Sequence, residues 1–133
     1  MFFTDTDNPF QLLSVIEYNN IKSQHTQMKC MDFDILSFRL KGCAEYRIGE
    51  RVISLKTGDL IFIPRHSHYS LCAADEHLIV FHFKTTCTHP LSPEYYTPRN
   101  PAAFKVAFEN VKHIDYKEHK QALLNICLKG LGN

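Results

Sequence analysis

Two histidines one residue apart, His66 and His68, are the first candidates for chemistry in this chain of 133 residues. Side chains of an extended backbone alternate in direction, so both imidazoles of such a pair point the same way. Two neutral imidazoles can bind zinc, iron or copper if His82 and Asp34 supply further ligands. The pair lies just past a strand that ends at Pro64, and we expect it to contact a polar ligand, with no bound metal. Exposed or structurally satisfied histidines are the alternative.

His82 and Tyr46 are further candidates for ligand binding. His82 shares one strand face with Leu78 and Val80, where the alternative is a buried histidine that is hydrogen-bonded within the core. Tyr46 offers an aromatic wall and a hydroxyl that can orient a ligand, and its alternative is a plain core tyrosine. We include both in the predicted site.

Asp34 is the acidic candidate. It alternates with Leu36 and Phe38, which directs its side chain inward, and a buried carboxylate needs a partner. Ser37 and Arg39 fall on the opposite face of the same strand, so we do not count them as pocket residues. The predicted ligand-binding set is Asp34, Tyr46, His66, His68 and His82.

The sequence holds no motif of a known catalytic type, because GxSxG, P-loop, HExxH and GxGxxG patterns do not occur. The cysteines are odd in number and scattered, and no CxxC pair exists, so we expect buried or half-buried free thiols in a reducing cytoplasm. They are Cys30, Cys43, Cys72, Cys87 and Cys127. We therefore predict no catalytic residues and no cofactor.

Composition limits the class of protein. Hydrophobic residues make up 44% and charged residues 22% of the chain, which is typical of one globular domain. The formal net charge of +1 gives no basic footprint for nucleic acid. No apolar run approaches the ~20 residues of a membrane span, and the N-terminus lacks the pattern of a secretory signal. We expect a cytoplasmic location, no membrane contact and no direct nucleic acid contact by this segment.

Before about residue 85 the chain reads as short strands separated by turns. Many short strands at close spacing are typical of a sandwich or a small barrel. A turn is expected at residues 73–76, and Leu60–Ile63 is apolar throughout, which indicates burial on both faces. The predicted strands are Leu12–Tyr18, Phe33–Leu40, Ala44–Ile48, Val52–Leu55, Leu60–Ile63, Tyr69–Cys72 and His77–Lys84.

Gly49 and Glu50 predict a two-residue hairpin loop, and a glycine in the first position suits a type II′ turn. The register that this turn sets pairs Ile48 with Arg51, Tyr46 with Ile53, and Ala44 with Leu55. One face of the hairpin is then apolar. A slip by one residue would bury Glu45 and Arg47, so the register is well specified.

After residue 85 the chain changes character. Four prolines mark residues 85–101 as an irregular connection, and residues 102–111 show helical spacing of apolar side chains. A second helix is expected from about Tyr116 to Lys129, and its last turns are apolar nearly all round. It packs on a second subunit or within its own chain, and we leave both open. The predicted dimerisation residues are Tyr116, Leu123, Leu124, Cys127 and Leu128.

Four motifs follow one another in order along the chain. They are the strand Phe33–Leu40 leading to Gly42, the hairpin Tyr46–Leu55, the segment Gly58–Pro64 with the pattern GDL-aliphatic-P, and His82-Phe83. Together, with the C-terminal helices, they resemble the N-terminal cupin-like domain of AraC-family transcriptional regulators. The resemblance covers roughly residues 12–130.

This resemblance implies a mainly β cupin-like double-stranded β-helix, a jelly-roll barrel, followed by two C-terminal α-helices. Residues 1–101 would form the sensor barrel with an N-terminal arm and a proline-rich connection. Residues 102–133 would form dimerisation and linker helices, cut before a DNA-binding domain. The implied function is to bind a small effector such as a sugar and to form a homodimer, while a helix-turn-helix domain beyond this segment contacts DNA.

A metal-dependent cupin enzyme acting on a small polar substrate is the alternative function. Catalytic cupins carry an HxH pair and a glutamate on an early strand and then a later histidine. Here His25 is alone, Asp34 stands near the glutamate position, and no glycine follows Pro64 before the two histidines. The metal-binding set that the family pattern requires is incomplete.

Overall fold

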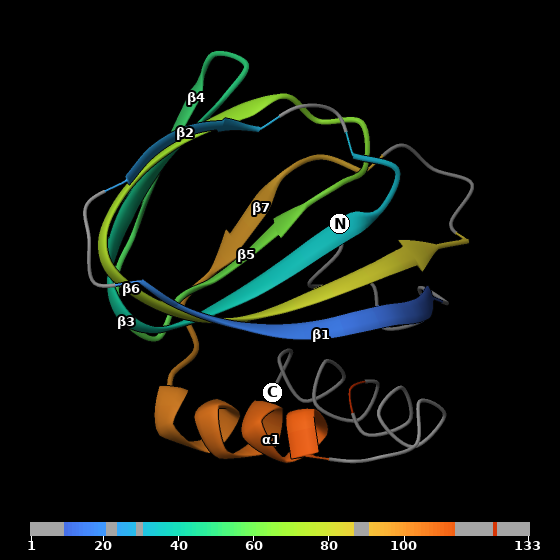
Figure 1. Ribbon diagram of the computed structural model, residues 1–133, viewed down its shortest axis with the longest axis vertical. Coiled ribbons are helices and arrows are strands. Elements are labelled where there is room, and N and C mark those ends of the chain that lie inside the picture. The colour runs from blue at the N-terminus through green and yellow to red at the C-terminus, as the bar shows by residue number, and fades with distance from the viewer. Residues whose placement is uncertain (1–9, 21–23, 29–30, 87–90, 114–123, 125–133) are drawn as a thin grey trace.

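Seven strands and one helix make up the described part of the chain. The computed structural model describes residues 10–20, 24–28, 31–86, 91–113 and 124. These residues form a mainly antiparallel β fold with a helix on its C-terminal side (Figure 1). The elements are β1 (Phe10–Asn20), β2 (Gln24–Met28), β3 (Asp34–Ile48), β4 (Arg51–Leu55), β5 (Leu60–Ile63), β6 (Tyr69–Thr85), β7 (Glu94–Tyr96) and α1 (Pro101–His113).

β3 and β6 are the two long strands around which the sheet is built. They pair antiparallel along almost their whole length, and each was predicted as two shorter strands. That prediction was wrong, as was the turn at residues 73–76, because the chain bends there without leaving the sheet. Gly42 has a φ of +89°, and a Cβ on it would lie 2.5 Å from the carbonyl oxygen of Asp75. The ladder is shifted on both sides of Lys41, as in a β-bulge, so a glycine allows the two strands to bend together.

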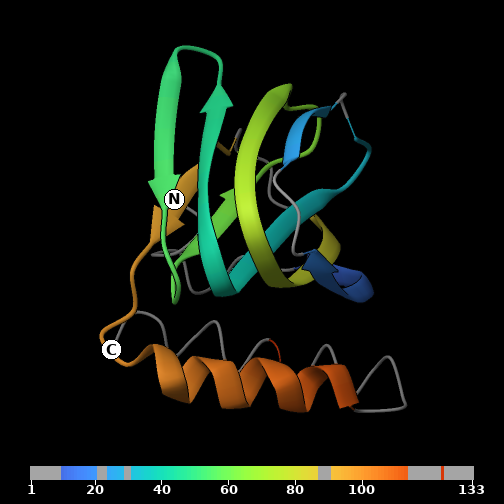
Figure 2. The ribbon, with the colours of Figure 1, turned by 60° about the vertical axis from the view of Figure 1, so that its left-hand side comes forward.

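This bend divides the sheet into two halves. In the first half β1 and β5 flank β6 and β3, with β7 next to β5. In the second half β2 pairs with β6 and β4 pairs with β3. Figures 1 and 2 show β3 and β6 curving over from one half to the other. The inner faces of the two halves therefore face each other.

Alternation along the strands supplies two separate apolar clusters. The inner cluster joins both halves of the sheet and includes Ile35, Tyr46 and Val80. The second cluster lies on the opposite face of the first half and includes Leu36 and Phe38. All four residues of β5 are buried, alternating between the two clusters. This confirms the predicted burial of β5 on both faces.

α1 covers the second cluster, beneath the first half of the sheet (Figure 2). The predicted helix over residues 102–111 is confirmed and extends slightly at both ends. Proline is well placed at the start of a helix, where its missing N–H is not needed. Phe108 is fully buried, with its ring 5.3 Å from that of Phe38 and 5.2 Å from that of Phe81.

The second predicted helix lies outside the described residues, except for Leu124. Leu124 is helical, fully buried and part of the second cluster, which α1 covers. The described part of the chain thus has one helix where two were expected. Of the five predicted dimerisation residues, the structure therefore describes Leu124 alone. The other four lie outside the described part, namely Tyr116, Leu123, Cys127 and Leu128.

The segment Gly58–Pro64 contacts the start of α1 and the residues just before it. Gly58 has a φ of +94°, and a Cβ there would lie 2.9 Å from the Cβ of Pro101, the first residue of the helix. The buried carboxylate of Asp59 accepts hydrogen bonds from the Lys56 N–H at 2.9 Å and the Thr97 hydroxyl at 2.9 Å. These contacts of Gly58 and Asp59 therefore hold the connection that leads into α1 against the turn.

The hairpin at Gly49 agrees with the prediction in every pair of its register. Gly49 has a φ of +61°, and the φ of Glu50 is not positive, as a type II′ turn requires. The strands β2 and β7 were not predicted, because β2 has a polar sequence and β7 lies in the proline-rich connection.

Two cysteines in the described residues, Cys43 and Cys72, are exposed free thiols. The predicted free state holds for them, but the predicted burial does not, because both lie on the outer face of the sheet's second half. Cys43 alternates with the buried Ala44, and Cys72 with the buried Ala73.

In the described residues, no helix has the length and apolar character needed to cross a bilayer.

Candidate ligand-binding site

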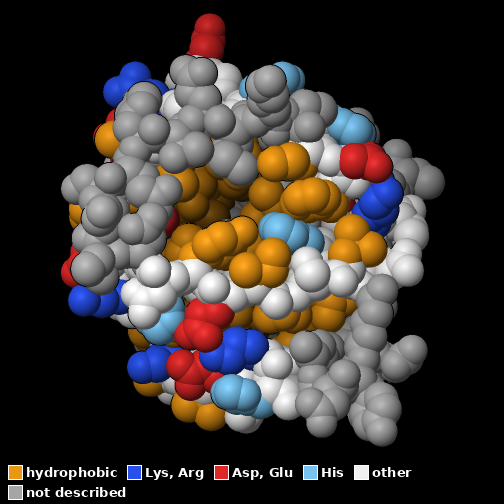
Figure 3. Space-filling view, viewed as in Figure 1, with side chains coloured by type: hydrophobic (Ala, Val, Ile, Leu, Met, Phe, Trp, Pro, Cys, Tyr) orange, Lys and Arg blue, Asp and Glu red, His pale blue; other side chains and the backbone are white. Residues whose placement is uncertain are grey.

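A cavity of about 490 Å³ opens between the two halves of the sheet. Its walls come mainly from the inner faces of β3 and β6. β3 contributes Ile35, Ser37 and Tyr46, and β6 contributes Tyr69, Leu71, Glu76, Leu78, Val80 and His82. Tyr18, Asn19, Met31 and Phe33 complete the described lining. Figure 3 shows the hollow on this face, with hydrophobic side chains around it.

A buried ion pair lies at one part of the cavity wall. Arg39 Nη2 donates to Glu76 Oε1 at 3.0 Å, and the side chains are 1% and 6% exposed. Glu76 is among the residues that line the cavity, and Arg39 is not. Arg39 Nε and Nη1 are buried and have no hydrogen-bond partner within the described part of the chain. The guanidinium is therefore held by one strong interaction and shielded from solvent.

Tyr46 and Tyr69 form an aromatic wall next to this pair, with ring centres 5.9 Å apart in a stacked arrangement. Burial raises the pKa of Tyr46 well above its usual range, although the neighbouring guanidinium of Arg39 opposes the shift. Burial also raises the pKa of Tyr69 to about 12. Both phenols are therefore protonated at neutral pH and can donate a hydrogen bond.

His82 lines another part of the cavity. Its Nδ1 lies 3.2 Å from the Ser14 hydroxyl on β1, and its ring is 4.3 Å from that of Phe33. Burial lowers the pKa of His82, so the imidazole is neutral at neutral pH. Its Nε2 has no hydrogen bond to another described residue. The predicted residues Tyr46 and His82 thus both face the cavity.

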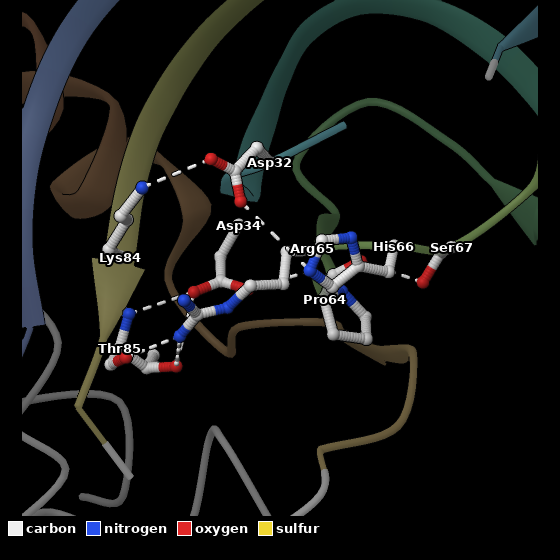
Figure 4. A network of polar contacts seen from close by, with 8 residues as sticks. All are labelled: Asp32, Asp34, Pro64, Arg65, His66, Ser67, Lys84 and Thr85. Atoms are coloured by element: carbon white, nitrogen blue, oxygen red, sulfur yellow. Dashed lines mark hydrogen bonds and ion pairs between the residues drawn. The ribbon is translucent and has the colours of Figure 1, made fainter. Parts of the chain in front are cut away.

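Asp34 does not line the cavity and belongs instead to the network of polar contacts drawn in Figure 4. It lies on the face of β3 that packs toward α1, and it is 1% exposed. Its carboxylate accepts hydrogen bonds from the Arg65 N–H at 2.7 Å, the Thr85 N–H at 2.8 Å and the Thr85 hydroxyl at 3.1 Å. Arg65 Nε lies 3.7 Å from the same carboxylate. Asp34 joins the start of β3, the segment after β5 and the end of β6.

His66 and His68 are both exposed and are not among the cavity-lining residues. His66 has a φ of +66°, its N–H donates to the Met31 carbonyl, and its Nε2 lies 4.0 Å from Asp32 Oδ1. The strand has ended before them, so strand alternation no longer directs the pair. His66, His68, His82 and Asp34 do not converge, and the described residues hold no cluster of three metal-ligating side chains.

Sequence reasoning missed the polar residues of the cavity, namely Ser37, Glu76 and the supporting Arg39. It placed Ser37 and Arg39 on the face opposite to the predicted pocket residue Asp34, and it placed Glu76 in a turn. Residues 34–39 are buried on both faces. The sequence gives little signal of this, because Ser37 and Arg39 share a face with Ile35 and make that face read as polar.

No protein-family model matches this sequence, and no curated protein shows significant similarity to it. Solved structures do match. The AraC-like transcriptional activator CuxR matches with a TM-score of 0.68 and 10% identity, over 94% of this chain and 56% of its own. ToxT from Vibrio cholerae, in an apo K231A form, matches with a TM-score of 0.66 and 11% identity, over 87% of this chain and 52% of its own.

A second structure of ToxT has an unsaturated fatty acid bound, and matches with a TM-score of 0.56 and 13% identity over 93% of this chain and 53% of its own. YhaK from Escherichia coli matches with a TM-score of 0.54 and 16% identity, over 66% of this chain and 43% of its own. The chain spans about half the length of these proteins. At such low identity the matches establish a shared fold, which most of this chain has in common with AraC-family regulators.

Proposed function

We propose that this chain is the effector-binding and dimerisation domain of an AraC-type transcription regulator. The observation that carries the proposal is the cavity, which lies between the two half-sheets and combines apolar walls with a few polar groups. Sites for small molecules typically have this character and a volume of roughly 300–1,000 Å³. The fold shared with CuxR and ToxT supports the same conclusion.

In this proposal the two half-sheets form a cupin-like jelly-roll barrel that works in the cytoplasm. DNA is contacted by a helix-turn-helix domain outside this segment, and the domain itself is not an enzyme. The effector acts by binding one arrangement of the barrel and C-terminal helices more tightly than another, because a ligand shifts an equilibrium only through such a difference in affinity.

The contacts of α1 supply a physical route for this bias. The backbone N–H of Arg39, the ion-pair partner of the cavity-lining Glu76, donates to the Asp59 carbonyl at 3.0 Å, and the Arg39 carbonyl accepts from the Gly58 N–H at 2.8 Å. Gly58 in turn abuts Pro101 at the start of α1. A ligand that displaces Glu76 and Arg39 can therefore shift α1 through two successive contacts, from Arg39 to Gly58 and from Gly58 to Pro101.

A fusion experiment tests effector response and dimerisation together. This chain is fused to a heterologous DNA-binding domain that represses a reporter only as a dimer, and small molecules are screened for a change in repression. We expect repression, modulated by compounds that also raise the melting temperature of the purified chain. Repression unaffected by any such compound, or a monomer of 15.4 kDa by light scattering, would contradict the proposal.

A further inference from the structure

Aromatic rings are concentrated around the cavity. Phenylalanine and tyrosine make up 12% of the whole chain, yet they supply four of the 13 described lining residues. On the first half of the sheet, Phe33, just before β3, lies beside His82 with the ring centres 4.3 Å apart. On the second half, Tyr46 lies beside Tyr69 with the ring centres 5.9 Å apart. Because the inner faces of the two halves face each other, a flat ring between them contacts both pairs.

The kind of ring differs between the two faces of the sheet. The buried rings of the second cluster, which α1 covers, are all phenylalanines. The cavity instead carries three tyrosines, Tyr18, Tyr46 and Tyr69. Tyrosine suits a position where the body of the ring is packed and its end meets a polar group. Burial raises the pKa of Tyr46 and Tyr69, so both phenols stay protonated at neutral pH and can donate a hydrogen bond.

Further hydrogen-bond donors lie beside Tyr46. Arg39 is on the same face of β3 as Ile35 and Ser37, which line the cavity. Its Nη2 donates to Glu76 Oε1 at 3.0 Å, and its Nε and Nη1 are buried without a partner among the described residues. A guanidinium has only donors, so it meets the Tyr46 phenol at the oxygen, and the phenol proton can be donated to a ligand. The polar group that matches this end of the cavity is an oxygen that accepts hydrogen bonds.

Building on the proposed effector function, we propose that the cavity binds a compound with a flat aromatic ring and an oxygen that accepts a hydrogen bond. The ring lies between the Phe33–His82 pair and the Tyr46–Tyr69 pair, and the ligand oxygen accepts from the Tyr46 hydroxyl. Contacts between aromatic rings are stronger than burial of the same area alone, by an amount that corresponds to about two- to tenfold in affinity.

Two compounds with the same carbon skeleton test the ring, namely 2-naphthol and its saturated counterpart decahydro-2-naphthol, which carry the same hydroxyl. Calorimetry on the purified chain measures both affinities, and we expect 2-naphthol to bind about fivefold more tightly. Equal or tighter binding of the saturated compound, or binding of neither, would overturn the ligand class. Tighter binding of glucose, the kind of effector expected from the sequence, would overturn it as well. The effector function is tested apart from these results, because the reporter fusion responds to any compound that alters repression.

Two variants identify the residues responsible. Tyr69→Leu removes a ring from the cavity and should weaken 2-naphthol binding about threefold more than it weakens decahydro-2-naphthol binding. Tyr46→Phe keeps the ring and should weaken the binding of both compounds about fivefold, the worth of one neutral hydrogen bond. Tyr95→Leu, on the exposed strand β7, is the matched control and should leave both affinities unchanged.

Circular dichroism establishes that each variant is folded before its affinities are compared. An unchanged ratio of the two affinities in folded Tyr69→Leu protein would contradict the role of the aromatic walls. An unchanged affinity for 2-naphthol in folded Tyr46→Phe protein would contradict the hydrogen bond to the ligand oxygen.

Discussion

Asp34 should stabilise the fold rather than bind a ligand, and its removal tests that assignment quantitatively. Asp34→Ala deletes a carboxylate that accepts three hydrogen bonds within 3.1 Å. Thr85 is buried, so its N–H has no route to water, and such an orphaned donor costs about 1–3 kcal/mol. Arg65 is 31% exposed and recovers part of its loss from solvent. The loss of stability is then about 3 kcal/mol, a large fraction of the ~5–15 kcal/mol typical of a domain.

Urea unfolding followed by circular dichroism measures this loss. With a denaturant dependence of about 2 kcal/mol/M, the midpoint should fall by about 1.5 M. Asp34→Asn keeps one acceptor oxygen and should fall between Asp34→Ala and the unaltered chain. Asp32→Asn is the matched control, because Asp32 is 78% exposed and pairs only at the surface, with Lys84 at 3.3 Å and His66 at 4.0 Å.

Equal midpoints for Asp34→Ala and Asp32→Asn would refute the structural role. A variant that is stable but no longer responds to the compounds that raise the melting temperature of the unaltered chain would restore Asp34 as a ligand residue.

Three further perturbations follow from the same contacts. Gly58→Ala should lower the free energy of unfolding by more than 1 kcal/mol, because alanine is strained at a φ of +94° and its Cβ would meet the start of α1. Gly49→Ala is the control: its Cβ would have open space, so the free energy of unfolding should fall by less in the same urea assay. Arg39→Met should cost about 3–5 kcal/mol by removing one member of a buried ion pair, and adding Glu76→Gln, which removes the buried negative charge as well, should recover part of that loss; equal stability of the single and double variants would contradict this. Because burial lowers the pKa of His82, the unfolded chain takes up a proton first as the pH falls below about 6.5, so stability present above that pH is lost below it; His82→Gln should flatten this part of the stability curve, measured by urea melts across pH.

Local patterns predicted much of the β framework. The hairpin at Gly49 was predicted in full, because a two-residue turn sets the pairing of every residue that follows it. β5 and α1 were also predicted correctly, since each depends on a run of apolar residues whose period is visible in the chain. The same reasoning divided β3 and β6 in two, because the bend at Gly42 has the composition of a turn but lies inside a continuous ladder.

The candidate site was less accessible to the sequence. Tyr46 and His82 were selected for their chemistry and do line the cavity, whereas Asp34, His66 and His68 were selected by the same criterion and lie elsewhere. Glu76 and Arg39 escaped notice because they become partners only when residues 37 positions apart meet across the bend.

The amino-acid sequence by itself determined the hairpin register, the burial of β5, the helix α1 and the turn at Gly58, because turn chemistry and apolar periodicity act between near neighbours. Only the tertiary structure decided which face of β3 lines a cavity and which packs on α1, since both faces of its first half are buried and alternation does not show what lies against each. It also decided that a buried ion pair, rather than the paired histidines, lies beside that cavity. Such choices depend on contacts between distant residues, which no local pattern contains.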